Sequence, residues 1–342
     1  MACELKDDGK TFPGRTLFTT SGSTCMRPTA VYLSPKHLTA DKSASGNASL
    51  NATLDVVLWL HGYEVQSHTA FFYDNASKVR EQVRDSNKDV ILIAPWLGFR
   101  HSVKDGPKSS HWEGKYHSEI LVGDKWGEQY LDEVLGALAR LQNPDSPPKF
   151  GIRNLVIACH SGGGVSMRNL AVTLGSYRAQ LKGCWGFDCL YTTKPADNDD
   201  ASFWYKFASA KNACPVDIVF GPTTLPQSVK LDLMGRGIIT GDGDKAVPAR
   251  TTINGLSVRI GHDATSAPHQ KIKVDDTDPA FLDNFTSASV PAKGRHKVPA
   301  PGAFLRSAIE NLTKAVNFPG DIHYMIARGG FLDKLKNASF LG

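Results

Sequence analysis

Apolar runs and amphipathic segments alternate along the chain from residue 55 onward. The apolar runs predict strands buried on both faces, and the segments between them repeat apolar residues at helical spacing. This alternation predicts a mostly parallel sheet with helices on both faces. The predicted strands are 54–62, 89–98 and 154–160, and the predicted helices are 71–86 and 128–142.

The same alternation continues after residue 161 and is preceded by a predicted antiparallel hairpin. Residues 262–301 are polar and rich in proline, which is typical of a lid or binding loop beside a site. No repeat or second domain signature appears, so we expect one domain over 1–342 with this irregular lid. The further predicted elements are the hairpin strands 16–20 and 29–34, a helix over 164–177, strands at 183–191, 216–222 and 255–261, and helical segments at 302–316 and 331–338.

Composition limits the classes of protein that fit this pattern. Hydrophobic residues make up 41% of the chain and charged residues 21%, as in a globular protein with a sizeable core. The net charge of +5 comes from dispersed residues without a dense basic run, which argues against nucleic acid as a partner. No apolar stretch is long enough to span a bilayer, so we expect no membrane span.

The terminus and the cysteines give an expectation about the compartment. The first residues lack the apolar centre of a signal peptide, and six cysteines are few for this length. A reduced, cytoplasmic protein is the simplest interpretation, although a chain whose signal peptide had been removed would look the same and would be secreted. N-x-S/T triplets at Asn47, Asn51 and Asn75 matter only in the second case.

The strongest chemical signal is the segment 154–164, where an apolar strand is followed by a serine with small neighbours and then by a glycine-opened helix. This order is typical of a nucleophile elbow, because the sharp turn between strand and helix tolerates only small neighbours and exposes the serine hydroxyl. Ser161 occupies the nucleophile position. Cys159 stands where the usual motif has its first glycine, and cysteine is small enough for the turn.

Strand, elbow and helix, together with the His-Gly pair in LWLHGYE at 58–64, resemble the α/β-hydrolase superfamily of serine esterases and lipases. In that superfamily such a pair begins the oxyanion loop after the third strand. The resemblance implies an α/β-hydrolase fold. It also implies that the backbone N–H groups of Tyr63 and Gly162 face the developing oxyanion.

A serine nucleophile needs a histidine base, which in this superfamily follows the serine and the acid along the chain. Four of the eleven histidines follow Ser161. His323 lies in a loop before the final predicted helix, where the superfamily usually places its histidine, and is preferred. His262 follows the possible strand 255–261 and remains the alternative, whereas His269 and His296 are expected on surface loops.

The acid that orients the histidine has two candidates. Asp188 ends the predicted strand after the elbow helix. Asp244 lies in GIITGDGDKAVP, which resembles the segment of the superfamily in which the acid follows the seventh strand. Residues 216–222 are the better candidate for that strand, so Asp244 falls on a later loop. Asp188 is therefore preferred. Neither the GDGD segment nor the histidines show the spacing of a calcium or zinc site, so no metal or cofactor is expected.

These patterns together predict a serine hydrolase that cleaves a carboxylic ester through an acyl-enzyme on Ser161, with His323 as base and Asp188 as acid. The substrate would be a small-molecule or polymeric ester. A peptidase, thioesterase or acyltransferase would use the same residues, and a non-catalytic binding protein on the same fold is the alternative from another class. The sequence leaves the oligomeric state open.

Overall fold

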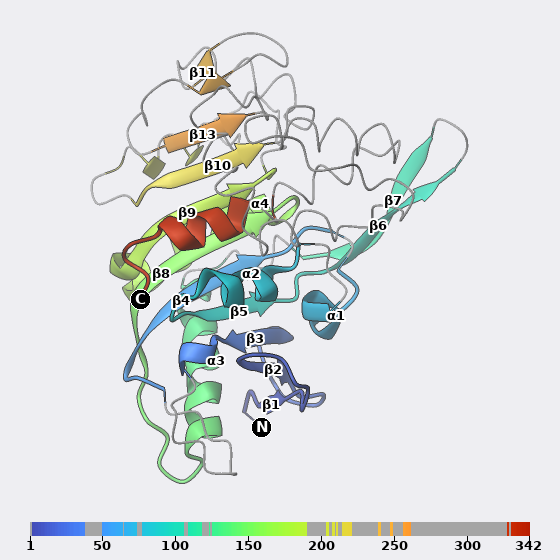
Figure 1. Ribbon diagram of the computed structural model, residues 1–342. Coiled ribbons are helices and arrows are strands. Elements are labelled where there is room, and N and C mark those ends of the chain that lie inside the picture. The colour runs from blue at the N-terminus through green and yellow to red at the C-terminus, as the bar shows by residue number, and fades with distance from the viewer. Residues whose placement is uncertain are drawn as a thin grey trace, which may run out of the picture. The chain divides into compact units, whose positions relative to one another are not determined.

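Figure 1 shows the computed structural model as a ribbon. The chain divides into two compact units, which are described one at a time. The first unit comprises Met1–Asn75, Ser86–Lys182 and Ser339–Gly342, and the second comprises Ala76–Asp85 and Gly183–Ala338. The structure describes residues 2–37, 50–63, 65–73, 77–105, 109–117, 123, 125–189, 203–204, 207–208, 210, 214–220, 239–240, 247–248, 256–260, 327 and 330–342.

The first unit is built on a sheet whose central strands are parallel. The strand order is β1 (Leu5–Asp7), β2 (Arg15–Thr19), β3 (Thr29–Leu33), β5 (Ile91–Pro95), β4 (Thr53–Leu60) and β8 (Gly151–His160). Strands β5 and β8 both pair with β4 in parallel, whereas β1, β2 and β3 form antiparallel pairs up to β5. Every residue from Leu54 to Leu60 is buried, as expected for a central strand covered on both faces.

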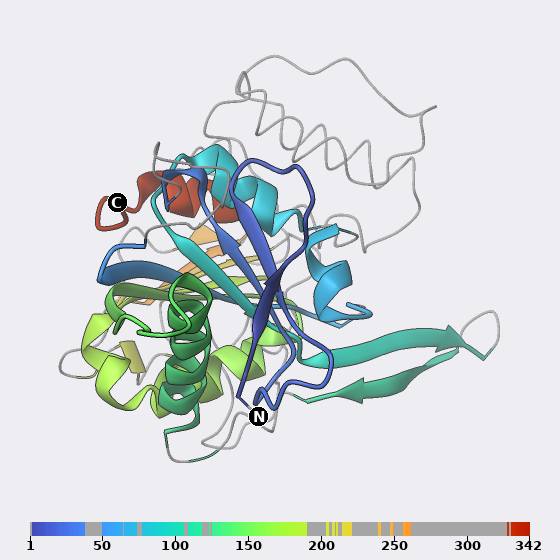
Figure 2. The same cartoon turned by 90° about the horizontal axis from the view of Figure 1, so that it is seen from below.

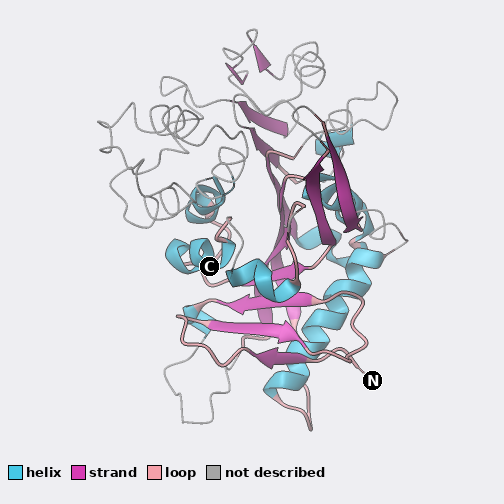
Figure 3. Ribbon diagram, turned by 90° about the vertical axis from the view of Figure 1, so that its right-hand side faces the viewer, coloured by secondary structure: helices cyan, strands magenta, loops and turns pink. Residues whose placement is uncertain are grey.

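Helices pack on this sheet through their apolar faces. Helices α3 (Trp126–Gln142) and α4 (Gly163–Thr173) lie side by side and cover one face, while α1 (His68–Tyr73) contacts β3 (Figures 2 and 3). A buried hydrogen bond of 2.9 Å between the hydroxyls of Tyr130 and Thr29 ties α3 to β3. Among the described residues of this unit there are also two short 3₁₀ helices, η1 (Pro35–His37) and η3 (Gly175–Gln180).

A two-stranded hairpin extends away from the rest of the first unit (Figures 1 and 2). Strands β6 (Gly98–Lys104) and β7 (Ser110–Tyr116) pair antiparallel from Gly98 opposite Tyr116 to Lys104 opposite Ser110. Its base is held by a 2.6 Å hydrogen bond from the N–H of His117 to the carbonyl of Leu97. The base of the hairpin therefore lies directly beyond the carboxyl end of β5.

The second unit contains its own parallel strands. Strands β9 (Leu181–Phe187) and β13 (Leu256–Ile260) both pair in parallel with β10 (Val216–Phe220), and β11 (Ile239–Thr240) pairs antiparallel with β12 (Val247–Pro248). The boundary between the units falls within β9 and within helix α2 (Val79–Ser86).

Two helical segments of the second unit are joined by the side chain of Gln82. Its amide nitrogen donates to the carbonyls of Ser77 and Ala327, and its amide oxygen accepts from the N–H of Leu332. The helix over 330–337 packs on β9, because the ring of Phe331 contacts those of Trp185 and Phe187 edge-on. This helix confirms the last helical segment expected from the sequence.

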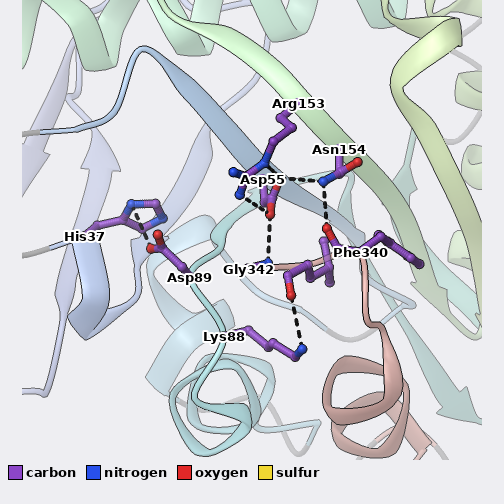
Figure 4. Close-up of polar contacts among 9 residues, drawn as sticks. His37, Asp55, Lys88, Asp89, Arg153, Asn154, Phe340 and Gly342 are labelled. Carbon is purple, nitrogen blue, oxygen red and sulfur yellow. Dashed lines mark hydrogen bonds and ion pairs between the residues drawn. The ribbon is translucent and has the colours of Figure 1, made fainter.

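Residues 340–342 of the first unit close against the amino ends of β4 and β8 (Figure 4). The buried carboxylate of Asp55 accepts hydrogen bonds from Arg153 at 2.7 and 2.9 Å, from the Asn154 amide at 2.9 Å and from the N–H of Gly342 at 2.9 Å. The Asn154 amide also donates to the carbonyl of Phe340 at 2.7 Å. These contacts lie at the opposite end of β4 and β8 from Ser161.

Cys3 and Cys25 form a disulfide, which differs from the reduced cysteines that the sequence favours. A sequence with few cysteines gives no sign of this pair, because the two residues meet only when β1 pairs with β2. None of the helices described is long and apolar enough to cross a membrane. The predicted lid at 262–301 lies outside the described residues.

Candidate active site

Ser161 occupies a sharp turn between strand β8 and helix α4. Its backbone lies in the left-handed region, with φ of 55°, which a residue other than glycine adopts only when the surrounding structure holds it there. The helix begins immediately, and the N–H of Gly164 donates to the carbonyl of Ser161 at 3.1 Å. The side chain is partly exposed, whereas its neighbour His160 is buried. This is the strand, turn and helix that the sequence predicts.

The loop after β4 lies against this turn. A β-carbon placed on Gly62 would come within 2.6 Å of Cβ and 3.1 Å of Oγ of Ser161, so only glycine fits there. A β-carbon on Gly162 would meet the ring of Tyr63 at 2.6 Å. The structure therefore brings together Ser161, Gly162 and Tyr63, which the sequence assigns to the nucleophile and the oxyanion donors.

His61 fixes the conformation of this loop by two hydrogen bonds of its ring. Its Nε2 accepts a hydrogen bond from the N–H of Leu97 at 2.8 Å, so Nδ1 carries the proton and donates to the carbonyl of Gly62 at 2.5 Å. Burial lowers the pKa of His61 to about 4, and the bond to Gly62 opposes this only in part. The imidazole is therefore neutral at physiological pH and joins the loop to the carboxyl end of β5.

Asp188, the preferred acid, follows strand β9 in the second unit. It is fully buried, has φ of 52°, and donates its backbone N–H to the carbonyl of Val219 at 2.7 Å. The turn folds back on the strand, because a β-carbon on Gly186 would lie 2.4 Å from Sγ of Cys189. The carboxyl ends of parallel strands share one edge, so Asp188 lies at the edge where β10 and β13 also end.

The other candidate residues cannot be placed in the same way. His323, His262, His269, His296 and Asp244 lie outside the described residues. The structure describes strand β13 up to Ile260, two residues before His262. Among the residues that the structure describes, no group of three or more His, Cys, Asp or Glu side chains could hold a metal ion.

Tyr116 is the residue of this region that sequence reasoning missed. It ends strand β7, its hydroxyl donates to the carbonyl of His61, and its ring contacts those of His61 and Tyr63 edge-on, at centroid distances of 5.7 and 4.8 Å. A tyrosine in a polar segment far along the chain carries no local motif. Only the fold brings it to the His-Gly pair.

Comparisons with known proteins give structural likenesses only. Neither a protein family nor a curated protein sequence matches this chain. A substrate-bound, fluorophosphonate-binding serine hydrolase from Staphylococcus aureus is similar at 14% identity and a TM-score of 0.41, over 73% of this chain and 91% of that one. A ferulic acid esterase is similar at 11% identity and a TM-score of 0.37, over 73% of this chain and 91% of that one. Identities and TM-scores this low carry no argument about activity.

The fold class rests on the architecture itself. Parallel strands with antiparallel strands at one edge, helices packed on the sheet, and a strained serine between a central strand and a helix define the α/β-hydrolase fold. The chain has this fold, as the sequence predicts.

Proposed function

We infer that the protein is a serine hydrolase that cleaves a carboxylic ester through an acyl-enzyme on Ser161. The observation that carries this proposal is the left-handed Ser161 at the start of α4, with Gly62 packed against its side chain. A core side chain has no need of a strained, partly exposed turn that is closed on one side by a glycine loop. An attacking hydroxyl needs both features.

The reaction would proceed in two halves. In the first, a histidine takes the proton of Ser161 while Oγ bonds to the ester carbonyl carbon, and the bond to the leaving alcohol then breaks as the histidine returns the proton to it. In the second, water loses a proton to the same histidine as its oxygen bonds to the acyl carbon. The bond from that carbon to Oγ then breaks as the histidine returns the proton to Oγ, which releases the carboxylic acid and restores Ser161. The backbone N–H groups of Tyr63 and Gly162 would stabilise the oxyanion in both halves.

The base in this proposal is His323, oriented by Asp188, with His262 as the alternative. Strand β13 supports keeping the alternative, because it ends at Ile260 on the edge where β9 and β10 also end, and His262 follows two residues later. The position of Asp188 directly after β9 supports its role as the acid. Both assignments can be tested separately from that of Ser161.

The test is covalent labelling followed by kinetics. A fluorophosphonate probe should modify Ser161, located by peptide mass spectrometry, and p-nitrophenyl esters of graded chain length should be hydrolysed. Ser161→Ala should abolish labelling and lower kcat by more than about a thousandfold while the far-ultraviolet circular dichroism is unchanged.

Ser176→Ala is the matched control, since Ser176 is an exposed serine of the same unit in the 3₁₀ helix η3. It should retain both labelling and turnover. Unchanged turnover in Ser161→Ala would refute the proposed function, and labelling at another residue would move the nucleophile there.

A further inference from the structure

The base of the hairpin β6–β7 meets the loop that approaches Ser161. Tyr116 is the last residue of β7, and its hydroxyl donates to the carbonyl of His61, one residue before Gly62. Gly62 in turn lies so close to Ser161 that a β-carbon on it would be 3.1 Å from Oγ. One hydrogen bond therefore connects the hairpin to the peptide next to the reactive side chain.

The ring of Tyr116 holds the same loop by packing. It contacts the His61 ring at 5.7 Å and the Tyr63 ring at 4.8 Å, both edge-on, so it contacts the side chains on either side of Gly62. Such edge-on pairs attract each other beyond the effect of the area that they bury, because the positive edge of one ring faces the negative face of the other. The position of the Tyr63 ring matters, because that ring fills the space above Gly162.

The environment of the hydroxyl favours a permanent donor. Burial raises the pKa of Tyr116 well above its ordinary value, and Ser166 of helix α4 lies beside the hydroxyl. The phenol thus stays protonated throughout the working pH range and donates to the His61 carbonyl. On the other side of His61, the N–H of Leu97 supplies the second fixed contact.

We propose that Tyr116 is a positioning residue that sets the oxyanion loop, residues 61–63, at the distance from Ser161 that the two backbone donors require. It does not take part in bond making. It acts through the His61 peptide and the Tyr63 ring. This inference rests on the proposed function, and it extends that function to a residue on the hairpin.

Removing the hydroxyl should loosen the loop without emptying the space. In Tyr116→Phe the ring stays but the His61 carbonyl loses its donor, so the N–H of Tyr63 is no longer held in place. A donor displaced by a fraction of an ångström stabilises the transition state less, and we expect kcat to fall about 10- to 100-fold with little change in KM.

A thionoester distinguishes this positioning from a general loss of structure. Sulfur accepts hydrogen bonds more weakly than oxygen, so an oxyanion hole accelerates hydrolysis of an ester more than that of its thionoester. The kcat/KM for the ester divided by the kcat/KM for its thionoester should therefore be smaller in Tyr116→Phe than in the wild type. Because both rates come from the same folded molecules, the ratio is independent of how much of the variant is folded.

Tyr32→Phe is the matched control. The hydroxyl of Tyr32 in β3 likewise donates to a backbone carbonyl, that of Pro13, at 2.5 Å, although Tyr32 is buried and Tyr116 is half-buried. Tyr32→Phe should lose comparable stability but keep the wild-type ratio. A ratio in Tyr116→Phe equal to that of the wild type would overturn the positioning role, whether or not both rates have fallen. Loss of labelling at Ser161 in the wild-type protein would instead refute the proposed function.

Discussion

His61 connects the loop beside Ser161 to the stability of the protein in acid. In the folded protein the pKa of His61 is about 4, below the ordinary value of about 6.5, because burial disfavours the charged form of the ring. Between these two values the unfolded chain binds a proton that the folded protein does not. The free energy of unfolding therefore falls as the pH is lowered from about 6.5 to about 4.

The expected loss over that interval is about 3 kcal/mol from this residue alone. Urea unfolding at a series of pH values would measure it, with His61→Gln as the variant that cannot titrate. The variant should show a pH dependence that is smaller by that amount. Identical profiles for the wild type and His61→Gln would show that His61 is not held neutral.

At this scale the sequence predicts what is local. Ser161 and the His-Gly pair are recognisable because a few neighbouring residues carry the chemistry. The contact between Tyr116 and His61 joins residues 55 positions apart and repeats no motif, so no pattern in the chain announces it. The neutral state of His61 depends likewise on burial and on Leu97, which only the folded structure reveals.

Among the elements, β4 and β8 depend on the closure of their amino ends by residues 340–342. Burial alone would raise the pKa of Asp55, but the hydrogen bonds from Arg153, Gly342 and Asn154 outweigh it and lower the pKa below its ordinary value. The carboxylate therefore stabilises the fold fully above about pH 4, and this contribution is lost as the pH falls through the lowered pKa.

Asp55→Asn should cost about 2 kcal/mol in the free energy of unfolding at pH 7, because it removes the charge from a buried acceptor of several hydrogen bonds. Asp7→Asn is the control. Asp7 pairs with Arg15 at 2.5 Å, but its side chain is 39% exposed, and such pairs contribute about 0–1 kcal/mol. Denaturant titration measures both. Equal effects of the two substitutions would mean that burial of Asp55 contributes nothing special. Since this network lies at the far end of the strands from Ser161, kcat should be unchanged.

The predictability of the elements follows their burial. The strands β4, β5 and β8 were predictable because each contains an unbroken run of five apolar residues, and the antiparallel pairing of β2 with β3 is confirmed. The single helix predicted over 71–86 is wrong, because α1 ends at Tyr73 and Lys78 has a φ of 49°, which no helix interior accepts. The hairpin β6–β7 was missed because it is largely polar and does not alternate.

At the scale of the whole molecule, the acid and the base of the proposed triad are each tested by a pair of substitutions. Triad logic predicts that His323→Ala approaches the loss of Ser161→Ala and that His262→Ala retains activity. It also predicts that Asp188→Asn lowers kcat by about 10⁴-fold, whereas Asp244→Asn does not. Turnover of one p-nitrophenyl ester by all four variants gives the comparison. If His262→Ala were inactive and His323→Ala active, the base would be His262, two residues after the end of β13.

The fold class was predictable for the whole chain, but the triad was only partly so. A parallel sheet follows from local alternation of apolar runs, and the elbow follows from adjacent residues. The acid and the base are single residues on separate loops, and several aspartates and histidines satisfy the same chain order. The position of Asp188 at the end of a strand was predicted from its neighbours in the sequence, whereas its full burial is seen only in the structure.

The hairpin divides into two parts that would tolerate change differently during evolution. Its base, from Gly98 and Tyr116 to His117, is fixed by contacts with Leu97 and His61, whereas the pairs beyond it contact mainly each other. Insertions or deletions of whole pairs near its tip would preserve the register at the base. Related chains are therefore expected to differ in hairpin length long before they lose the tyrosine at its root.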